Sequence, residues 1–245
     1  MKLESSLIDA LRAAERVVVL SGAGISAESG VPTFREAQTG HWARFRPEDL
    51  ATPEAFRRDP KLVWDWYASR RAQLQQVTPN PGHYALVEME RRLKHLLIAT
   101  QNVDGLHARA GSQQVCELHG NIMRTKCFTE NLGVEVWTET AETPPRCPRC
   151  GGWLRPDVVW FNESLPADVF QECLSASARC DVFLSVGTSS LVYPAASLPL
   201  EALRSDAVVI EVNPQRTPLT ERAHHFLQGP SGRVLPALVA AAWPC

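Results

Sequence analysis

Apolar residues repeat at helical spacing at the start of the chain and are followed by a short unbroken apolar run. The helix-spaced positions are Leu3, Leu7, Leu11 and Ala14. They predict an amphipathic helix that leads into a buried strand over residues 17–20 and then into a turn with glycines at 22 and 24. The predicted order is therefore helix, strand, glycine turn.

Further short runs, rich in β-branched residues, predict buried strands with helical patterns between them. These runs cover residues 96–100, 115–118, 182–186 and 208–212. Because strands that alternate with helices are typical of parallel sheets, the expected fold class is α/β, with a mostly parallel sheet and helices on both faces.

Two segments interrupt this alternation and predict a second, smaller lobe. Residues 32–81 carry aromatic and arginine-rich helical stretches, and residues 121–156 carry paired cysteines and several prolines. We therefore expect one domain over residues 1–245, built from a large α/β lobe and a small lobe made of two insertions. The large lobe is assigned residues 1–34, 83–120 and 157–245, and the small lobe residues 35–82 and 121–156.

Charge and composition exclude several classes of protein. The 25 basic and 27 acidic residues leave a net charge of -2, so no basic excess favours binding to nucleic acid. The longest uncharged stretch, residues 182–200, contains Pro194 and Pro199, which argues against a membrane span. Residues 1–16 lack the basic start of a secretory signal. We expect a cytoplasmic protein with no membrane partner.

The seven cysteines are odd in number and unevenly spread, which favours metal binding or burial over a disulfide framework. A four-cysteine zinc ribbon needs two Cys-x-x-Cys pairs; here Cys147 and Cys150 form one pair, but the other is Cys127-x-x-Glu130. Three thiolates still favour Zn²⁺, with Glu130 or a water as the fourth ligand. The alternative is a degenerate ribbon whose thiols are only packed. Cysteines 116, 173, 180 and 245 are expected to be buried or incidental.

The glycine turn fits the G-x-G-x-x-G/A pattern over residues 22–27. Such glycines allow a tight turn and let the backbone approach a pyrophosphate, although many strand-to-helix turns need glycine only for close packing. The acidic residue expected about 20 positions further on has no clear equivalent, since Gly40, His41 and Trp42 lie there. A dehydrogenase that transfers hydride is therefore disfavoured.

Five sequence blocks together resemble the motif set of the sirtuin family, in family order. They are Gly22-Ala23-Gly24-Ile25-Ser26 with its continuation through Glu28 and Gly30 to Thr33-Phe34-Arg35, Thr100-Gln101-Asn102-Val103-Asp104-Gly105-Leu106-His107, Leu118-His119-Gly120, Gly187-Thr188-Ser189 and Val212-Asn213. The resemblance implies an NAD-dependent protein-lysine deacylase with a Rossmann-like NAD-binding lobe and a small lobe that bears a zinc ribbon. Any zinc would then be structural, because this chemistry needs no Lewis acid.

The resemblance assigns catalysis to three residues. His119 would be the general base that activates a ribose hydroxyl, and a histidine suits this step because its ordinary pKa is near 6.5. Asn102 and Asp104 would hold nicotinamide and the reacting ribose. Without the flanking motifs, His119 would be a packed core residue, and Asn102 and Asp104 would belong to an Asx turn.

The resemblance also implies a set of NAD contacts. In the predicted mobile cofactor loop, Phe34 would shield the reactive carbon from water. Gln101 would support the ribose. The full set is Gly22, Ala23, Gly24, Ile25, Ser26, Glu28, Thr33, Phe34, Arg35, Gln101, Asn102, Val103, Asp104, Gly187, Thr188, Ser189, Asn213, Pro214, Gln215 and Ser231.

The substrate peptide is expected to add as a strand between residues 158–163 and 190–193, through backbone hydrogen bonds that do not read sequence. The sequence departs from the family here, because Asn162 replaces the glycine of the usual Phe-Gly-Glu triplet. Asn tolerates unusual dihedral angles, so we expect altered affinity and not loss. The predicted substrate residues are Ala51, Tyr67, Arg70, Val159, Phe161, Glu163 and Val192.

The identity of the acyl group is suggested by Tyr67 and Arg70, three apart on a helix predicted over residues 61–77. By pattern alone they would be a solvated surface pair. The sequence resembles the class III branch of the sirtuins, whose Tyr and Arg at this position bind the carboxylate of succinyl-, malonyl- or glutaryl-lysine. Ala51 matches the small residue that makes room for a longer acyl chain.

The resulting hypothesis is a deacylase that removes succinyl and malonyl groups, and acetyl more weakly, from lysine in proteins or peptides. Its products would be nicotinamide and O-acyl-ADP-ribose. One alternative is a mono-ADP-ribosyltransferase or NAD glycohydrolase that uses the same pocket, which Tyr67 and Arg70 disfavour. Another is a non-catalytic NAD-sensing module, which His119, Asn102 and Asp104 disfavour. We expect a monomer.

Overall fold

The computed structural model describes residues 3–31, 46, 50–138 and 142–244. Its centre is a six-stranded sheet in the order β3-β2-β1-β6-β7-β8, in which every neighbouring pair is parallel. The strands are β1 (Arg16–Ser21), β2 (His95–Thr100), β3 (Val115–Glu117), β6 (Val182–Val186), β7 (Val208–Asn213) and β8 (His225–Gln228). The predicted α/β class with a Rossmann-like parallel sheet is confirmed.

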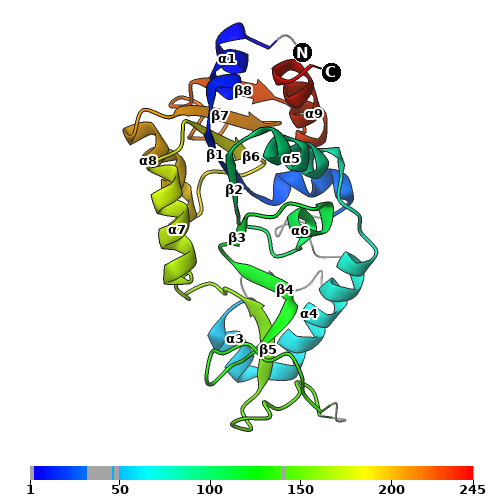
Figure 1. Ribbon diagram of the computed structural model, residues 1–245. Coiled ribbons are helices and arrows are strands. Elements are labelled where there is room, and N and C mark those ends of the chain that lie inside the picture. Colours follow the sequence, from blue (N-terminus) through cyan, green and yellow to red (C-terminus); the bar gives the residue numbers. More distant parts are fainter. Residues whose placement is uncertain (1–2, 32–45, 47–49, 139–141, 245) are drawn as a thin grey trace.

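Helices cover both faces of this sheet (Figure 1). One face packs against α1 (Ser5–Ala13), α5 (Pro81–Arg92) and α9 (Ser231–Ala242), and the other against α7 (Ala167–Ser177) and α8 (Leu198–Arg204). Along β1, Val17 and Val19 join the first core, while Val18 and Leu20 join the second. Because both faces of β1 are buried, residues 17–20 are apolar without a break.

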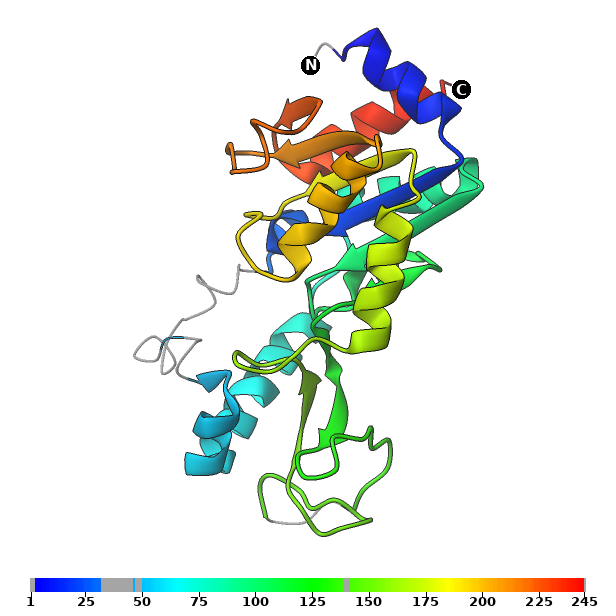
Figure 2. The same ribbon diagram turned by 90° about the vertical axis from the view of Figure 1, so that its left-hand side faces the viewer.

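The remaining elements form the small end of the molecule (Figure 2). They are helices α3 (Pro53–Arg58) and α4 (Pro60–Gln75) and an antiparallel pair, β4 (Gly120–Cys127) and β5 (Leu154–Val158). Thr52 and Asp59 cap the two helices by accepting hydrogen bonds from Ala55 N and Leu62 N. A core that includes Phe56, Trp66 and Trp160 joins the helices to the strands.

Several predicted boundaries differ from the structure. The glycine turn leads into two short 3₁₀ segments, η1 (Ala23–Ile25) and η2 (Ala27–Ser29), and the helix predicted over residues 61–77 is α4, whose bounds are residues 60–75. A further 3₁₀ segment, η4 (Ala195–Ser197), and the short helix α6 (Leu106–Ala110) complete the described elements. Strands β4, β5 and β8 were not predicted. None of the described helices is long and apolar enough to cross a membrane.

Candidate active site

The glycine turn lies against the end of β6. Gly22 N donates to Val186 O at 3.0 Å, and Gly24 N donates to Gly187 O at 2.8 Å. A Cβ atom on Gly24 would lie 2.7 Å from Gly187 Cα, which leaves no room for a side chain. The glycines are therefore needed for close packing, and that packing brings the turn to the carboxyl ends of β1 and β6, where open α/β sheets bind ligands.

Three predicted polar residues meet at this edge of the sheet. Ser26 Oγ donates to Asp104 Oδ2 at 2.7 Å, and Asn102 Nδ2 lies 3.1 Å from both Ser26 Oγ and Gly22 O. Burial raises the pKa of Asp104, although hydrogen bonds from Leu106 N and Ser26 oppose the rise. Leu106 N donates to Asp104 Oδ1, which is the hydrogen bond of an Asx turn, so the Asx turn considered from the sequence is present at Asp104. The turn uses only one of the two carboxylate oxygens.

His83 supports this cluster from α5 and was not predicted. Asn80 N donates to His83 Nδ1 at 3.3 Å, so the neutral ring carries its proton on Nε2, which lies 3.5 Å from Ser26 Oγ. Burial lowers the pKa of His83 to about 4, which keeps the ring neutral. The capping box of Asn80 and His83 at the start of α5 was the available sequence signal.

His119 lies between β3 and β4, and its Nδ1 is 2.9 Å from Gln101 O. A carbonyl oxygen only accepts, so Nδ1 carries the proton, and in the neutral ring Nε2 has a free lone pair. Among the described residues nothing is hydrogen-bonded to Nε2. Burial lowers the pKa of His119, and the bond to Gln101 opposes this only in part. The ring is therefore built to accept a proton at Nε2.

Side chains also link the ends of β2, β6 and β7. Gln101 Nε2 donates to Thr188 Oγ1 at 2.9 Å, and Asn213 Nδ2 donates to Thr188 O at 2.8 Å. Ser231 Oγ is buried at the start of α9 and has no hydrogen-bond partner among the described residues. Such an orphaned hydroxyl at a helix N-terminus fits a polar ligand.

The other predicted cofactor residues are placed as follows. Glu28 Oε2 accepts a hydrogen bond from Gly232 N at 2.6 Å, and Val103 O accepts one from Ile122 N at 2.9 Å. Ile25 is fully buried, and Ala23 and Gly187 are half-buried in the packed turn. The exposed members are Glu28, Ser189, Pro214 and Gln215. The residues Thr33, Phe34 and Arg35 lie outside the described residues.

The segment after β5 is tied to His119 and to the small end of the molecule. Val159 N donates to His119 O, and Phe161 N donates to Ala51 O, both at 2.9 Å. Asn162 adopts φ 68°, the left-handed conformation that asparagine tolerates. Exposed apolar side chains follow on this segment and on the loop after β6, namely Phe161, Leu191, Val192 and Tyr193.

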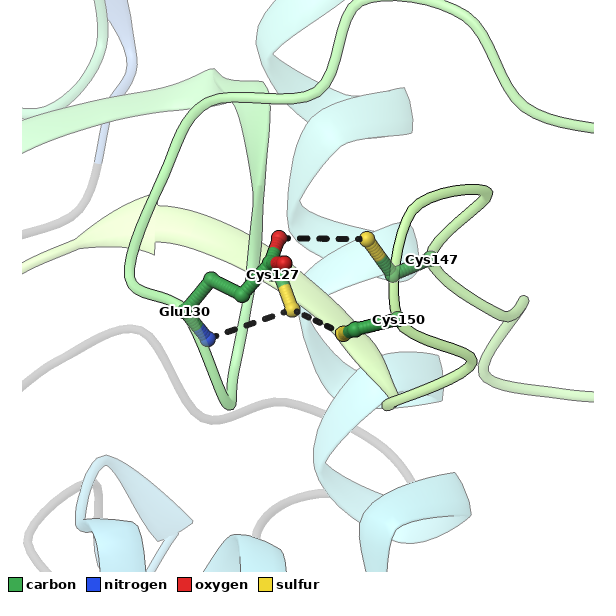
Figure 3. Close-up of side chains that lie close together, drawn as sticks. All are labelled: Cys127, Glu130, Cys147 and Cys150. Atoms are coloured by element: carbon green, nitrogen blue, oxygen red, sulfur yellow. Dashed lines mark hydrogen bonds between the residues drawn. The ribbon is translucent and has the colours of Figure 1, made fainter.

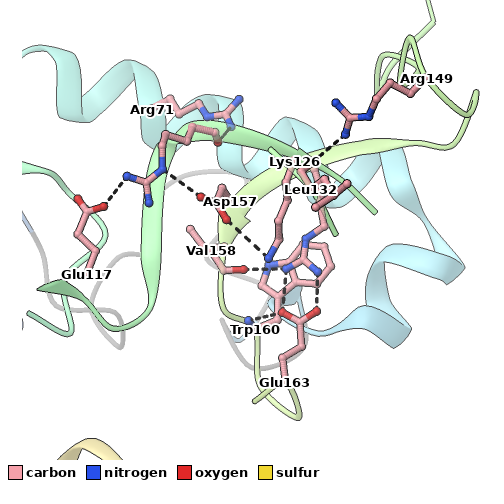
Figure 4. A network of polar contacts seen from close by, with 11 residues as sticks. Arg71, Glu117, Lys126, Leu132, Arg149, Asp157, Val158, Trp160 and Glu163 are labelled. Atoms are coloured by element: carbon pink, nitrogen blue, oxygen red, sulfur yellow. Dashed lines mark hydrogen bonds and ion pairs between the residues drawn. The ribbon is translucent and has the colours of Figure 1, made fainter. Parts of the chain in front are cut away.

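Glu163 is held by its own segment. Its carboxylate accepts two hydrogen bonds from the Arg155 guanidinium and one from Trp160 N (Figure 4). These bonds lower the pKa of Glu163 despite its partial burial. The carboxylate is therefore ionised and fixes the backbone of the segment that carries Val159 and Phe161.

Tyr67 is buried and Arg70 half-buried, so they are not the solvated surface pair that the pattern alone favours. Tyr67 is 4% exposed and lies in the core of the small end, where burial raises its pKa to about 12. Burial lowers the pKa of Arg70, and the two side chains are close enough for the Arg70 charge to act on the Tyr67 hydroxyl. Ala51, 3% exposed, belongs to the same core. A half-buried cation beside a buried phenol is suited to a carboxylate.

The predicted metal ligands come together in the insertion between β4 and β5 (Figure 3). One ligand atom from each of Cys127, Glu130, Cys147 and Cys150 lies within 4.8 Å of the others. Cys127 Sγ is 3.4 Å from Cys150 Sγ, and Cys147 Sγ is 3.7 Å from Glu130 Oε2. Ligands about 2.0 to 2.3 Å from a tetrahedral Zn²⁺ are separated by similar distances, so this set fits zinc.

Known proteins resemble this chain over most of its length. The model of the Sir2 family matches residues 22–194. A protein of Ralstonia nicotianae named "NAD-dependent protein deacylase" is 53% identical over 94% of this chain and 93% of that protein. One of the same name from Deinococcus radiodurans is 52% identical over 94% of this chain and 96% of its own length.

Solved structures give the same result. A structure described as a "Sir2 homolog-NAD complex" has a TM-score of 0.90 and 44% identity, covering 98% of this chain and 94% of that one. Another, described as "Sir2-p53 peptide-NAD+", has a TM-score of 0.82 and 29% identity over 97% of both chains. The likeness therefore extends over both ends of the molecule.

Proposed function

This chain belongs to the Sir2 family and is an NAD-dependent protein deacylase, and within that activity we propose that it prefers lysines that carry an acidic acyl group. Succinyl- and malonyl-lysine are the proposed substrates, with acetyl-lysine used more weakly. The products are nicotinamide, O-acyl-ADP-ribose and the free lysine.

The observation that supports this preference is the placement of the half-buried Arg70 beside the buried Tyr67. A charge-assisted hydrogen bond contributes about 1.5 to 3 kcal/mol, and a buried group left without its partner loses a similar amount. A succinyl carboxylate would bond to both side chains, whereas an acetyl group offers them no carboxylate. The pair would therefore favour an acidic acyl chain over acetyl by the free energy of these hydrogen bonds.

The glycine turn and the polar cluster beside it form the proposed NAD site. Bound NAD supplies a ribose carbon with a good leaving group, nicotinamide. Asn102 and Asp104, held by Ser26 and His83, would fix the nicotinamide end. Gln101, Thr188, Asn213 and Ser231 would bind the ribose and adenosine end. The remaining predicted contacts are Gly22, Ala23, Gly24, Ile25, Glu28, Thr33, Phe34, Arg35, Val103, Gly187, Ser189, Pro214 and Gln215.

His119 is the proposed general base. Its Nε2 would take a proton from a ribose hydroxyl, and its Nδ1–H bond to Gln101 O keeps the ring in the tautomer that this requires. Because burial lowers the pKa of His119, the ring is unprotonated at neutral pH. The ring proposed to accept the proton is thus held by Gln101, directly after β2 and just before Asn102 and Asp104.

The substrate peptide would bind beside Val159, Phe161 and Val192. The exposed apolar side chains there and the open backbone of the segment suit an extended peptide, which adds through main-chain hydrogen bonds. Glu163 would contribute by fixing this segment through Arg155. Sequence preference among target lysines should then be low.

The cysteine cluster is the proposed structural zinc site, with Cys127, Cys147 and Cys150 as thiolate ligands and Glu130 as the fourth. Zinc would hold the insertion together, since ligands from its two ends converge there. The described cysteines are all free, as thiolate ligation requires, and a reducing cytoplasm would keep them so. We further propose that the protein acts as a monomer.

Mass spectrometry of matched peptides tests the proposal. One peptide sequence would carry acetyl-, succinyl-, malonyl- or glutaryl-lysine and be incubated with and without NAD. The expected result is NAD-dependent loss of the acidic acyl groups at a higher kcat/KM than loss of acetyl. Faster removal of acetyl than of every acidic group would overturn the preference while leaving the deacylase activity in place.

A further inference from the structure

We propose that Trp160 is a positioning residue that determines acyl specificity, because its indole N–H directs the Tyr67 hydroxyl proton toward the acyl carboxylate. The inference rests on the proposed preference for acidic acyl groups. It adds to that preference a residue that acts through Tyr67.

The key contact joins the segment after β5 to α4. Trp160 Nε1 lies 3.0 Å from Tyr67 Oη, and both side chains are buried. An indole N–H can only donate, so the Tyr67 oxygen must accept this bond. The phenolic proton is then left to point elsewhere, and among the described residues nothing accepts it.

The protonation state of Tyr67 supports the same arrangement. Burial raises the pKa of Tyr67 to about 12, so the phenol keeps its proton at any pH at which the enzyme would work. Arg70 on the same helix face supplies a positive charge nearby. A carboxylate that enters this region therefore meets one directed O–H donor and one cation, which is the recognition set of an acidic acyl chain.

Trp160 is itself held firmly. The Arg155 guanidinium lies 3.2 Å from the centre of the indole ring and makes two hydrogen bonds to the Glu163 carboxylate. The same carboxylate accepts from Trp160 N, and Arg155 also donates to Val158 O at 2.8 Å (Figure 4). Because Trp160 is only 2% exposed and its ring packs against Arg155, the direction of its indole N–H is fixed.

This chain of contacts joins acyl recognition to the peptide segment. Val159 and Phe161, the neighbours of Trp160, make backbone hydrogen bonds to His119 and Ala51. The residues that hold the backbone beside the general base therefore also orient the Tyr67 hydroxyl. An acetyl group has no carboxylate to accept the Tyr67 proton, so the ratio between acidic and acetyl substrates reports on this orientation.

Two conservative variants test the inference. Trp160→Phe removes the indole N–H and keeps an aromatic ring, and we expect it to lower the succinyl-to-acetyl ratio of kcat/KM about tenfold, the equivalent of one hydrogen bond of about 1.4 kcal/mol. The loss should be mainly in KM for the succinyl peptide. Trp64→Phe, on the same small end but with its ring beside Arg71, is the matched control and should leave the ratio unchanged.

The double variant Tyr67→Phe/Trp160→Phe distinguishes an effect of Trp160 on the Tyr67 hydroxyl from a general loss of structure. In a Tyr67→Phe background the hydroxyl is absent, so adding Trp160→Phe should not lower the ratio further. A further drop there, or an unchanged ratio in Trp160→Phe alone, overturns the inference. If Trp160→Phe does not fold, the benzothiophene analogue of tryptophan at position 160, with sulfur in place of N–H, has the same outline and carries the same expectation.

The outcomes also distinguish this inference from the proposed function. If Tyr67→Phe and Arg70→Met both leave the succinyl-to-acetyl ratio unchanged, the acidic-acyl preference itself is wrong. If those variants lower the ratio and Trp160→Phe does not, the preference stands and only the role of Trp160 is wrong.

Discussion

His119 Nδ1 and the main-chain oxygen of Gln101 lie 2.9 Å apart, and this bond sets the tautomer of the ring. The carbonyl cannot donate, so the proton is on Nδ1 and the free lone pair is on Nε2. Gln101 follows β2 directly and precedes Asn102, so the same turn orients the proposed base and carries two of the residues proposed to hold the nicotinamide end. One loop would thereby place both the proposed base and the proposed nicotinamide site.

The pH dependence of kcat/KM should report on His119. Burial lowers its pKa below the ordinary value of 6.5, so activity should persist down to below pH 6.5 and fall as the pH drops through the lowered pKa. Steady-state rates measured across this pH range at saturating NAD would give the pH at which activity falls. His119→Asn should lower kcat by about 10² to 10⁴. An acid limb above pH 6.5 would contradict the assigned environment.

Zinc binding should depend on Glu130. The purified protein is expected to hold close to one zinc per chain, and chelation should lower its melting temperature. Glu130→Cys should tighten zinc binding at least tenfold, because a thiolate suits zinc better than a carboxylate, and Glu130→Ala should weaken it. Competition with a chromophoric chelator measures both. Glu135 is exposed on the same insertion, and Glu135→Ala is the control. Equal zinc affinities of Glu130→Ala and Glu135→Ala would exclude Glu130 as a ligand.

Stability should fall on mild acidification because of two buried histidines. Burial lowers the pKa of His83 to about 4 and of His107 to about 3, against 6.5 in the unfolded chain. Between about pH 6.5 and 4 the unfolded chain binds more protons, so stability rises with pH there, by up to about 1.4 kcal/mol per pH unit for each histidine. The raised pKa of Asp104 opposes part of this.

Urea unfolding at pH 7.5 and 5.0 measures this dependence. His107→Gln should flatten it, since the glutamine does not take up a proton. His95→Gln, at the exposed start of β2, should leave it as in the parent protein. A free energy of unfolding that is the same at both pH values would show that the buried rings are not the neutral groups described.

The left-handed backbone at Asn162 makes the position sensitive to the residue that occupies it. With φ at 68°, Asn162→Ala should destabilise the protein by about 1 kcal/mol, whereas Asn162→Gly should be neutral or mildly stabilising. Chemical denaturation gives the free energies of unfolding. Asn162→Gly should also lower the KM for peptide, because it removes a side chain from the peptide segment. The reverse order of stabilities would contradict the backbone assignment.

Much of the large lobe was predictable because its strands are buried on both faces. The sequences of β1, β6 and β7 are mainly apolar and rich in β-branched residues, which predicts buried strands. Strand β8 was missed because it is a short edge strand with His225 and Gln228 at its ends. Strands β4 and β5 were missed because charged residues occupy them, and Pro156 lies within β5.

The sequence indicates the motif residues proposed for the site, but it does not indicate the residues that support them. Asn102, Asp104 and His119 stand in recognisable sequence blocks, whereas the contacts of His83 with Ser26 and of Trp160 with Tyr67 join residues 57 and 93 positions apart. No local pattern specifies such pairs. For Arg70 a signal did exist, since Val63, Trp66, Tyr67 and Leu74 form the buried stripe of α4 and Arg70 falls within it.

The most direct test of the account is the effect of Arg70→Met on matched succinyl- and acetyl-lysine peptides. Methionine keeps much of the volume and removes the charge, so the succinyl-to-acetyl ratio of kcat/KM should fall by about 10- to 100-fold, the loss of one charge-assisted interaction of about 1.5 to 3 kcal/mol. Arg71→Met, one position along the helix, is the matched control. A ratio that stays the same in Arg70→Met, with both substrates slowed equally, would contradict the account.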